Sequence, residues 1–384
     1  MITNIPKHWK IKKLGEIANI SSGTTPFRKN PLFYDNADIP WVKTTDLNNS
    51  YITTTEEKVS MYALNNTSLR LYPTNTVLVA MYGGFNQIGR TGKLAMEATI
   101  NQALSALVLK NDDVNSDYLL FWLNANVEKW KRFAGSSRKD PNINGKDVAE
   151  FSILIPPLEE QEKIAEILLT CDKAIRLTTQ IITQLKQRNQ GLAQQLLTGE
   201  KRVKGFEKSV WKEVKLGELL DYGQPTNYLV KNTDYSDEYK IPVLTAGKTF
   251  ILGYTNEKEG ICTNIPLILF DDFTTDSRYI DFPFKVKSSA VKLLKAKKNV
   301  NLRFIFEAMK LIKYAIGGHE RHWISKYAFL TIFVPSFKEQ NAIDQILDTA
   351  HQELKLYEQK LQLLQAQKKT LMQKLLTGEI LTIK

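Results

Sequence analysis

Trp9-Lys-Ile-Lys-Lys-Leu-Gly-Glu16 recurs as Trp211-Lys-Glu-Val-Lys-Leu-Gly-Glu218, and this repetition decides how the chain is organised. A second pair of strings, Gln194-Gln-Leu-Leu-Thr-Gly-Glu200 and Gln373-Lys-Leu-Leu-Thr-Gly-Glu379, closes the two copies. The offset between copies is 202 positions at the first pair and 179 at the second, so the second copy has 23 fewer residues in its interior. A repeat with preserved ends and a changed interior predicts two similar domains that do the same kind of work on different targets.

Each copy begins with a segment in which short strands and a helix are expected. Apolar runs bounded by Asn, Gly and Pro predict strands at Asp38–Val42 and Thr76–Tyr82, and at Lys240–Leu244 and Pro266–Phe270. Helices are expected at Ser116–Arg132 and Asn301–Tyr314, and a strand that ends in proline closes each segment, at Phe151–Pro156 and Leu330–Pro335. The mixture predicts a compact α+β domain in each copy.

After each of these prolines the sequence takes the pattern of a long helix. From Glu159 to Leu197 there is no proline, and apolar side chains alternate spacings of four and three, which is a heptad seam. At about 1.5 Å per residue, such a helix is about 60 Å long. Each helix closes at Thr-Gly-Glu, where glycine provides a left-handed cap. The seam positions are Ile164, Leu168, Cys171, Ile175, Thr178, Ile182, Leu185, Asn189, Leu192 and Leu196, and, 179 positions later, Ile343, Leu347, Ala350, Leu354, Tyr357, Leu361, Leu364, Lys368, Leu371 and Leu375.

The connections predict how the two helices run. Only the short segment 200–210 leads from the first helix into the second copy, so the second domain is expected at the far end of that helix. To pack its seam, the second helix then has to run back as an antiparallel coiled coil. The alternative is that each seam packs on its own domain, but a helix this long overhangs a domain of about 150 residues. We expect domains at 1–158 and 201–335, with helical spacers at 159–200 and 336–384 in a pseudo-twofold tandem repeat.

Composition indicates a polyanionic partner. The net charge is +11 with a pI of about 9.3, and the two globular segments carry all of it because the helical segments sum to zero. Cys171 and Cys262 are too isolated for a disulfide framework or a metal site. The N-terminal segment has no apolar signal region, and no run approaches the length of a membrane span. We therefore expect a cytoplasmic protein without a membrane segment.

No convincing catalytic motif is present. Gly84-Phe-Asn-Gln-Ile-Gly-Arg-Thr91 has the spacing of a phosphate-binding loop, but arginine stands where the phosphate-binding lysine is needed. His319 and His322 form the one close histidine pair, which is short of ligands for zinc. We expect neither a catalytic residue nor a metal in this chain.

Basic and polar residues near turns are the candidates for DNA contact. Arg, Lys, Asn and Gln are the side chains that read guanine and adenine edges, and small residues let the backbone approach phosphates. The segment Gly135–Lys139 precedes the final strand of the first copy, and Gly317–Trp323 takes its place in the second. An ordinary solvated loop is the alternative for any single charge. The candidates are Lys43, Thr44, Arg90, Lys93, Asn101, Gln102, Ser136, Ser137, Arg138 and Lys139 in the first copy, and Lys248, Arg278, His319, Arg321, His322 and Lys326 in the second.

The whole chain resembles the specificity subunit of type I restriction-modification systems. The motifs that carry the resemblance are the repeated Trp-Lys-x-x-Lys-Leu-Gly-Glu, the string that runs from Ile155 to Ile164, Val334-Pro-Ser-Phe-Lys-Glu-Gln340, and Leu-Leu-Thr-Gly-Glu at 196 and 375. The second copy departs from the first with Ser336-Phe337 for Pro157-Leu158.

The resemblance implies two target recognition domains spaced by helices and no catalysis in this chain. It also implies double-stranded DNA, two modification (methyltransferase) subunits and restriction (translocase and nuclease) subunits as partners, with S-adenosylmethionine, ATP and Mg²⁺ acting in those subunits. Because the two domains differ in sequence, the expected target is asymmetric and bipartite.

Two other classes of protein remain alternatives. A stand-alone DNA-binding or DNA-modifying enzyme with its own recognition domains needs a carboxylate cluster or a complete Asn-Pro-Pro-Tyr-type motif, and Asn30-Pro-Leu-Phe33 lacks the second proline. A purely structural coiled-coil protein is expected to be mostly seam, whereas about three quarters of this chain is globular.

Overall fold

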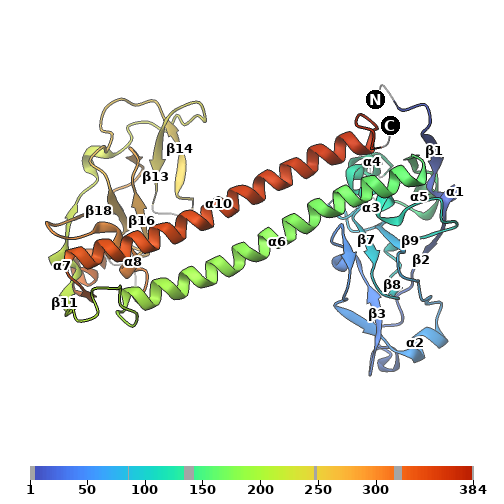
Figure 1. The fold of residues 1–384 in the computed structure, drawn as a ribbon, viewed down its shortest axis with the longest axis horizontal. Helices are drawn as coiled ribbons and strands as arrows, with labels where there is room; N and C mark the ends of the chain where they lie inside the picture. The colour runs from blue at the N-terminus through green and yellow to red at the C-terminus, as the bar shows by residue number, and fades with distance from the viewer. Residues whose placement is uncertain (1–4, 85, 134–141, 246–248, 315–321, 383–384) are drawn as a thin grey trace. The chain divides into compact units, whose positions relative to one another are not determined.

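The structure is a computed structural model that describes residues 5–84, 86–133, 142–245, 249–314 and 322–382 (Figure 1). The chain divides into two compact units. Unit 1 comprises 1–179 and 360–384, and unit 2 comprises 180–359. Each unit therefore contains one globular domain, one end of the first long helix and one end of the second.

Unit 1 contains the first domain, which extends from β1 to β10. Its elements are β1 (Lys10–Lys13), α1 (Leu14–Ile17), β2 (Ala18–Ser22), η1 (Pro31–Phe33), β3 (Ile39–Val42), η2 (Thr44–Asp46), β4 (Tyr51–Ile52), β5 (Glu57–Val59), α2 (Met61–Asn66), β6 (Val77–Ala80), β7 (Thr91–Leu94), β8 (Thr99–Ile100), β9 (Leu104–Leu109), α3 (Ser116–Ala125), α4 (Val127–Phe133), α5 (Gly145–Glu150) and β10 (Ser152–Ile155).

The core of the first domain lies on both faces of a five-stranded sheet with the order β2-β9-β6-β7-β4. The central strand β6 is Val-Leu-Val-Ala, and all four residues are buried, as expected for a strand covered on both faces. Val77 and Val79 pack in one core with α3, while Leu78 and Ala80 pack in another with Val42 of the three-stranded sheet β5-β3-β8. A two-stranded ribbon, β1-β10, leads to the first long helix.

Unit 2 contains the second domain, which extends from β11 to β19. Its elements are β11 (Lys212–Lys215), α7 (Leu216–Leu219), β12 (Leu220–Gly223), η3 (Thr226–Tyr228), β13 (Ile241–Leu244), β14 (Ile251–Thr255), β15 (Leu267–Asp271), β16 (Ser277–Ile280), β17 (Lys285–Val286), β18 (Val291–Ala296), α8 (Leu302–Met309), α9 (His322–Ser325), η4 (Tyr327–Phe329) and β19 (Thr331–Val334).

The second domain repeats the strand order of the first. Its sheets are β12-β18-β15-β16, β14-β13-β17 and β11-β19; among the described residues, the edge strand β4 alone has no counterpart. The offset is 202 between β3 and β13, 186 between the helix-capping residues Asn115 and Asn301, and 179 between β10 and β19. The 23 residues are therefore missing in two places, before and after the helix α8.

Each expected strand is present, but the two short helices are shorter than predicted. The first ends at Ala125 because Asn126 leaves the helical conformation and its side chain caps the carbonyl of Trp122 (2.8 Å); α4 then begins at Val127. The second ends at Met309 rather than at Tyr314. The local cap that ends the first helix is not revealed by apolar periodicity.

The long helices are α6 (Leu158–Leu197) and α10 (Phe337–Leu376), each within two residues of its predicted start (Figure 1). Every seam position is buried or half-buried. In unit 1, Ile164 and Leu168 of α6 share a core with Leu371 and Leu375 of α10.

Unit 2 contains further contacts between α6 and α10. Lys186 pairs with Glu358 (2.9 Å), Arg188 pairs with Glu353 (2.7 Å), and the Asn189 amide donates to the carbonyl of Ala350 (2.8 Å). The partner number falls as the α6 number rises, so these two helical segments run in opposite directions. Because the Asn189 contact satisfies a buried polar group, it helps to fix their register.

The repeated motifs join each domain to its long helix. The buried Glu160 near the start of α6 accepts hydrogen bonds from the Trp9 indole (3.0 Å) and the His8 ring (3.1 Å). In unit 2, the equivalent Glu339 accepts from the Trp211 indole (3.3 Å) and from the Arg202 guanidinium (2.9 Å). The tryptophan and glutamate of the two motifs thus form one anchor in each unit.

The next glutamine completes this anchor. Gln161 donates to the carbonyl of Pro156 (2.9 Å) and accepts from the backbone of Asn115 (2.9 Å), which caps α3. Gln340 does the same with Pro335 (3.0 Å) and Asn301 (2.8 Å). Both glutamines are buried. The Pro and Glu-Gln strings therefore hold the fold together.

The glycine at the end of each long helix packs against the opening motif of the domain in its own unit. Gly199 (φ +76°) lies on the Trp211 ring in unit 2, and Gly378 (φ +74°) lies on Pro6 and near Trp9 in unit 1. A side chain at 378 would collide with the Pro6 ring, so glycine is required there for space as well as for conformation. Within the described residues, none of the helices has the length and apolarity that crossing a membrane needs.

Candidate nucleic-acid interface

Four turns of the first domain are tied together by backbone hydrogen bonds. The Asn101 amide donates to the carbonyl of Val42 (2.9 Å), which joins the β8–β9 turn to the end of β3. The Met81 amide donates to Ala103 (2.8 Å), and the Ile143 amide donates to Met81 (3.0 Å). These two bonds join the β6–β7 turn and the segment before α5 to the same group of turns. We call these turns (residues 43–46, 81–84, 86–90, 101–103 and 142–144) the first loop edge.

The second domain repeats this set of bonds at the equivalent positions. Lys287 donates to the carbonyl of Leu244 (2.9 Å), Asp272 donates to Ala290 (3.0 Å), and His322 donates to Asp272 (2.9 Å). The second loop edge therefore consists of residue 245, the β15–β16 turn with the start of β16 (272–278), the β17–β18 turn (287–290) and the residues that begin α9 (322–326). The scaffold is the same in both domains although the side chains differ.

Eight of the nine candidate DNA-contact residues that the structure describes lie on these edges. Lys43, Thr44, Arg90, Asn101 and Gln102 lie on the first, and Arg278, His322 and Lys326 lie on the second. Lys93 lies within β7, away from the turn. Seven other candidates lie outside the described residues: Ser136, Ser137, Arg138, Lys139, Lys248, His319 and Arg321.

Lys43 is held by two carboxylates at the end of β3. Its ammonium lies 2.6 Å from Glu57 and 2.9 Å from Glu56. The hydrogen bond to Glu57 raises the pKa of Lys43 above its usual value, so the group stays charged at neutral pH. The neighbouring Thr44 is half-buried and begins the short helix η2. Contact with a phosphate would require Lys43 to exchange these carboxylates for the new partner.

Arg90 and Asn101 are partly committed to the first domain itself. The Arg90 guanidinium donates to the carbonyl of Leu47 (2.6 Å) and to the Gln87 side chain (2.9 Å). The buried amide oxygen of Asn101 has no hydrogen-bond partner among the described residues, whereas Gln102 is exposed and accepts from Thr25. Arg90 therefore shapes the β6–β7 turn, and Gln102 is the more accessible of the two amides.

Lys93 serves the interior of the domain. It is only 3% exposed, and its ammonium lies 2.6 Å from Asp117 and 3.0 Å from the Ser116 hydroxyl. It also lies over the Tyr51 ring. A buried ammonium with these partners ties β7 to the start of α3, so Lys93 does not form part of the loop-edge surface.

On the second edge, Arg278 and Lys326 are exposed whereas His322 is fully buried. Arg278 stands 3.3 Å from Asp276 and over the Phe250 ring, a pair too exposed to be worth much. The Nδ1 atom of His322 lies 3.4 Å from the Tyr314 hydroxyl. His322 thus supports the edge from beneath, and Arg278 remains accessible to a ligand.

A buried acid fixes the second edge. One carboxylate oxygen of Asp272 accepts from the Trp323 amide (2.8 Å), and the other lies 3.4 Å from the ammonium of Lys292, which donates to Gln224 (2.9 Å). Asp272 and Lys292 are each at most 1% exposed. This polar cluster ties the β15–β16 turn to the start of α9.

Sequence reasoning missed several exposed residues on the two edges. Lys287 and Ser288 occupy the positions of Asn101 and Gln102, at an offset of 186. The offset changes along the repeat, so only strand pairing identifies these equivalents. Tyr82 and Phe273, one in each β6–β7-type turn, were also missed.

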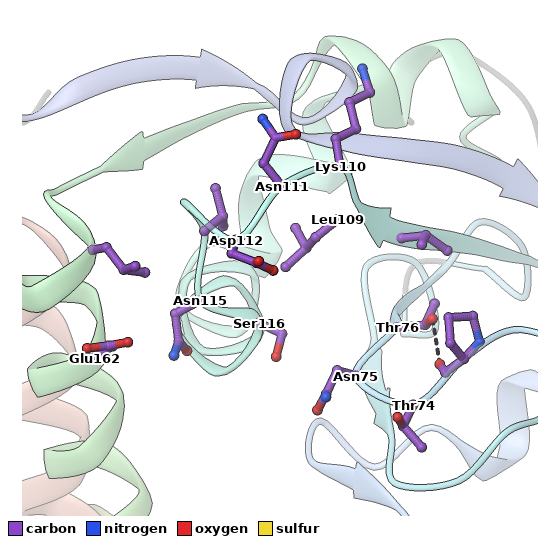
Figure 2. A pocket seen from close by; sticks show the side chains of 14 residues that line it. Thr74, Asn75, Thr76, Leu109, Lys110, Asn111, Asp112, Asn115, Ser116 and Glu162 are labelled. Carbon is purple, nitrogen blue, oxygen red and sulfur yellow. Dashed lines mark hydrogen bonds between the residues drawn. The ribbon is translucent and has the colours of Figure 1, made fainter.

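A hollow of about 400 Å³ lies elsewhere in the first domain, between the head of α6 and the start of α3 (Figure 2). Asn115, Ser116 and Glu162 face it, and Asn115 is already used to cap α3. Its lining includes neither His nor Cys. A similar hollow of about 500 Å³ in unit 2 is lined by the equivalent Asn301 and Phe337. Across the described residues, no group of three or more His, Cys, Asp or Glu side chains is arranged to hold a metal.

The two loop edges occupy equivalent positions in the two domains but carry different side chains. This arrangement is that of a protein with two similar binding domains. The sequence matches the family described as "Type I restriction modification DNA specificity domain" over residues 6–187 and 208–366, and the chain belongs to this family.

Its relatives are specificity subunits. The chain is 47% identical over 146 residues to the type I restriction enzyme EcoR124I/EcoR124II specificity subunit of Escherichia coli. This match covers 35% of this chain and 36% of that protein. The chain is 34% identical over 179 residues to the MjaIX specificity subunit of Methanocaldococcus jannaschii, which covers 45% and 40%. The matches thus span less than half of these two relatives.

A solved structure shares the fold. The type I restriction-modification S subunit from M. genitalium superposes with a TM-score of 0.65 at 16% identity and covers 97% of each chain.

Proposed function

We propose that this chain is the DNA sequence-recognition subunit of a type I restriction-modification complex, and that each loop edge binds one half of an asymmetric, bipartite DNA site. The observation that carries the proposal is that the same set of backbone hydrogen bonds ties the turns of both edges together, while the side chains on the two edges differ. A shared backbone arrangement with different side chains suits two domains that bind DNA in the same way but recognise different base sequences. Base edges in the major groove give each sequence a distinct pattern of donors and acceptors.

We further propose that α6 and α10 pair along their seams as an antiparallel coiled coil that spaces the two domains. The pairs that Lys186, Arg188 and Asn189 form with α10 in unit 2 support this, as does the shared core of the two helices in unit 1. A spacer of fixed length would set the number of unread base pairs between the half-sites.

We propose that two modification subunits bind the equivalent surfaces of the two copies, and that restriction subunits join them. A hollow beside the start of the long helix is present in both units, at Asn115 in unit 1 and at Asn301 in unit 2. This repetition supports a pseudo-twofold arrangement of two identical partners. In this proposal S-adenosylmethionine, ATP and Mg²⁺ act in those partners in the cytoplasm, and this chain supplies recognition alone.

Methylation mapping tests the proposal. The chain is coexpressed with its modification subunits in a host that lacks other such enzymes, and the methylated sites are read by whole-genome sequencing. We expect one bipartite motif with two different halves. Cells that express the modification subunits alone are the control. A single continuous motif, or methylation that does not depend on this chain, would refute the proposal.

The alternative function, a stand-alone DNA-modifying enzyme, predicts turnover without partners. We expect that the purified chain binds duplex DNA but transfers no methyl group from S-adenosylmethionine and makes no break with Mg²⁺. Radiolabel transfer and strand-break assays measure this. Turnover that persists after contaminating subunits have been removed would support the alternative.

Arg278→Ala is expected to alter only the half-site bound by the second domain, because Arg278 is exposed on the second edge. A lost base contact should cost about 1 to 3 kcal/mol and relax one position, whereas a lost phosphate contact should weaken all sequences and flatten the salt dependence. Methylation profiles of the assembled complex separate these results. Lys298→Ala, which removes an exposed charge outside the edge, is the matched control. A change in the other half-site, or no change in either profile or affinity, contradicts the assignment.

A further inference from the structure

Each loop edge presents an exposed aromatic side chain at the same structural position. Tyr82 follows Met81, and Phe273 follows Asp272; Met81 and Asp272 make the equivalent backbone bonds that define the two edges. Tyr82 is 37% exposed and Phe273 is 39% exposed.

The aromatic type is retained although the two turns otherwise differ. After Tyr82 the first turn continues with Gly83 and Gly84, whereas after Phe273 the second continues with Thr274 and Thr275. Most other exposed aromatics do not recur in this way: Phe333 of β19, for example, corresponds to the buried Leu154 of β10. Single exposed apolar residues are common on protein surfaces, so the recurrence, rather than the exposure, carries the argument.

The turn that presents Phe273 is firmly built. The buried Asp271 carboxylate accepts from the Phe273 amide (3.0 Å) and from the Thr274 hydroxyl (2.5 Å), and the Asp271 carbonyl accepts from the Thr275 amide (2.9 Å). Thr275 has φ +59°, which a β-branched residue rarely adopts. In the first domain, Gly84 (φ +80°) makes the corresponding left-handed step. Backbone strain that is kept in place by several bonds points to a functional turn.

We propose that Tyr82 and Phe273 are a pair of aromatic contacts to DNA that are insensitive to base sequence, with each ring packed on the apolar surface of bases or sugars. This inference rests on the proposed function. The two domains are expected to bind different sequences, so a feature common to both suits what all half-sites share. Phenylalanine has no hydrogen-bonding group and cannot read a donor and acceptor pattern. Its contact would be apolar, as in the stacking of bases on aromatic side chains.

The contact predicts a distinctive effect on affinity. The full chain, assembled with modification subunits, is tested against a duplex that carries the site found by methylation mapping and against a scrambled duplex of equal composition. We expect Tyr82→Ala and Phe273→Ala each to lower the affinity for both duplexes by about 5- to 100-fold. The preference between the duplexes and the slope of affinity against salt should remain those of the wild type, because no charge is removed. The double variant should show the product of the two single effects, since the residues lie in separate domains.

Conservative and control variants separate this role from a structural one. Tyr82→Phe and Phe273→Tyr should bind as the wild type does, and Phe333→Ala, which removes an exposed ring outside the edge, should have no effect on DNA binding. If an alanine variant fails to fold, Phe273→Leu is tested in its place. We expect it to lose less DNA affinity than the alanine variant, because leucine keeps most of the apolar volume.

Three results would overturn the inference. A changed base preference would make the rings sequence readers. Lost assembly with unchanged DNA binding by the chain would make them partner contacts, and unchanged binding throughout would leave them without a role. Failure of the wild-type complex to bind the mapped site would instead refute the proposed function itself.

Discussion

Leu185→Pro should abolish methylation at the original bipartite site. Leu185 is 7% exposed at a seam position of α6, in a helix that contains no proline. Proline removes a backbone donor and clashes with the preceding turn, which costs about 3 kcal/mol or more and kinks the helix. If α6 and α10 space the domains, the kink changes the distance between half-sites while each globular domain keeps its own core.

The measurement is the methylation rate at the native site and at sites with altered spacers. Gln187→Ala, an exposed helical position close by, is the control and should behave as the wild type does. Methylation by the proline variant at the wild-type rate and spacing would show that the helix pair does not act as a spacer.

Glu339→Ala should destabilise unit 2 by about 3 kcal/mol. Glu339 is fully buried and accepts from Arg202, Ser209 and Trp211, so its removal leaves a guanidinium and an indole without their acceptor. Breaking a buried ion pair from one side costs about 3 to 5 kcal/mol. The lower end applies here because the Arg202 side chain is 22% exposed. Urea unfolding of the full chain, followed by tryptophan fluorescence, measures the loss.

The neighbour and the repeat provide matched controls. Lys338→Ala removes an exposed side chain one position earlier and should leave the stability unchanged. Glu160→Ala should weaken unit 1 instead, because Glu160 makes the corresponding bond to Trp9. If Glu339→Ala unfolds at the wild-type urea concentration, the glutamate is not an anchor.

The sequence predicted the parts of the fold that depend on repetition and period. The repeated strings located two domains, β10 and β19 each end one residue before the proline that was expected to close them, and the seam positions of α6 and α10 are all at least half-buried. These features depend on apolar spacing along the chain. The break between α3 and α4 was not predicted, because one side chain, Asn126, makes it through a local cap.

The candidate site was predicted only in outline. Turns that are far apart in sequence meet through backbone bonds such as that from Ile143 to Met81, which leave no compositional trace. Lys93 was expected at the surface, but its charge is balanced by Asp117, 24 residues away in a different element. Phe273 was missed because a lone aromatic in a turn is informative only beside its counterpart Tyr82.

The core of unit 1 is built from the first domain, the start of α6 and the end of α10, so it cannot be completed until the ribosome has made almost the whole chain. Leu375 and Leu376 belong to the core of unit 1, together with Trp9 and Leu168. At about 5 to 20 residues per second, Leu375 emerges roughly 10 to 40 seconds after Leu168. During that interval the first-made domain lacks part of its core, and the seam of the nascent α6 has no partner. The first domain is thus completed last, so its transient apolar surface is where aggregation or chaperone binding during translation is expected.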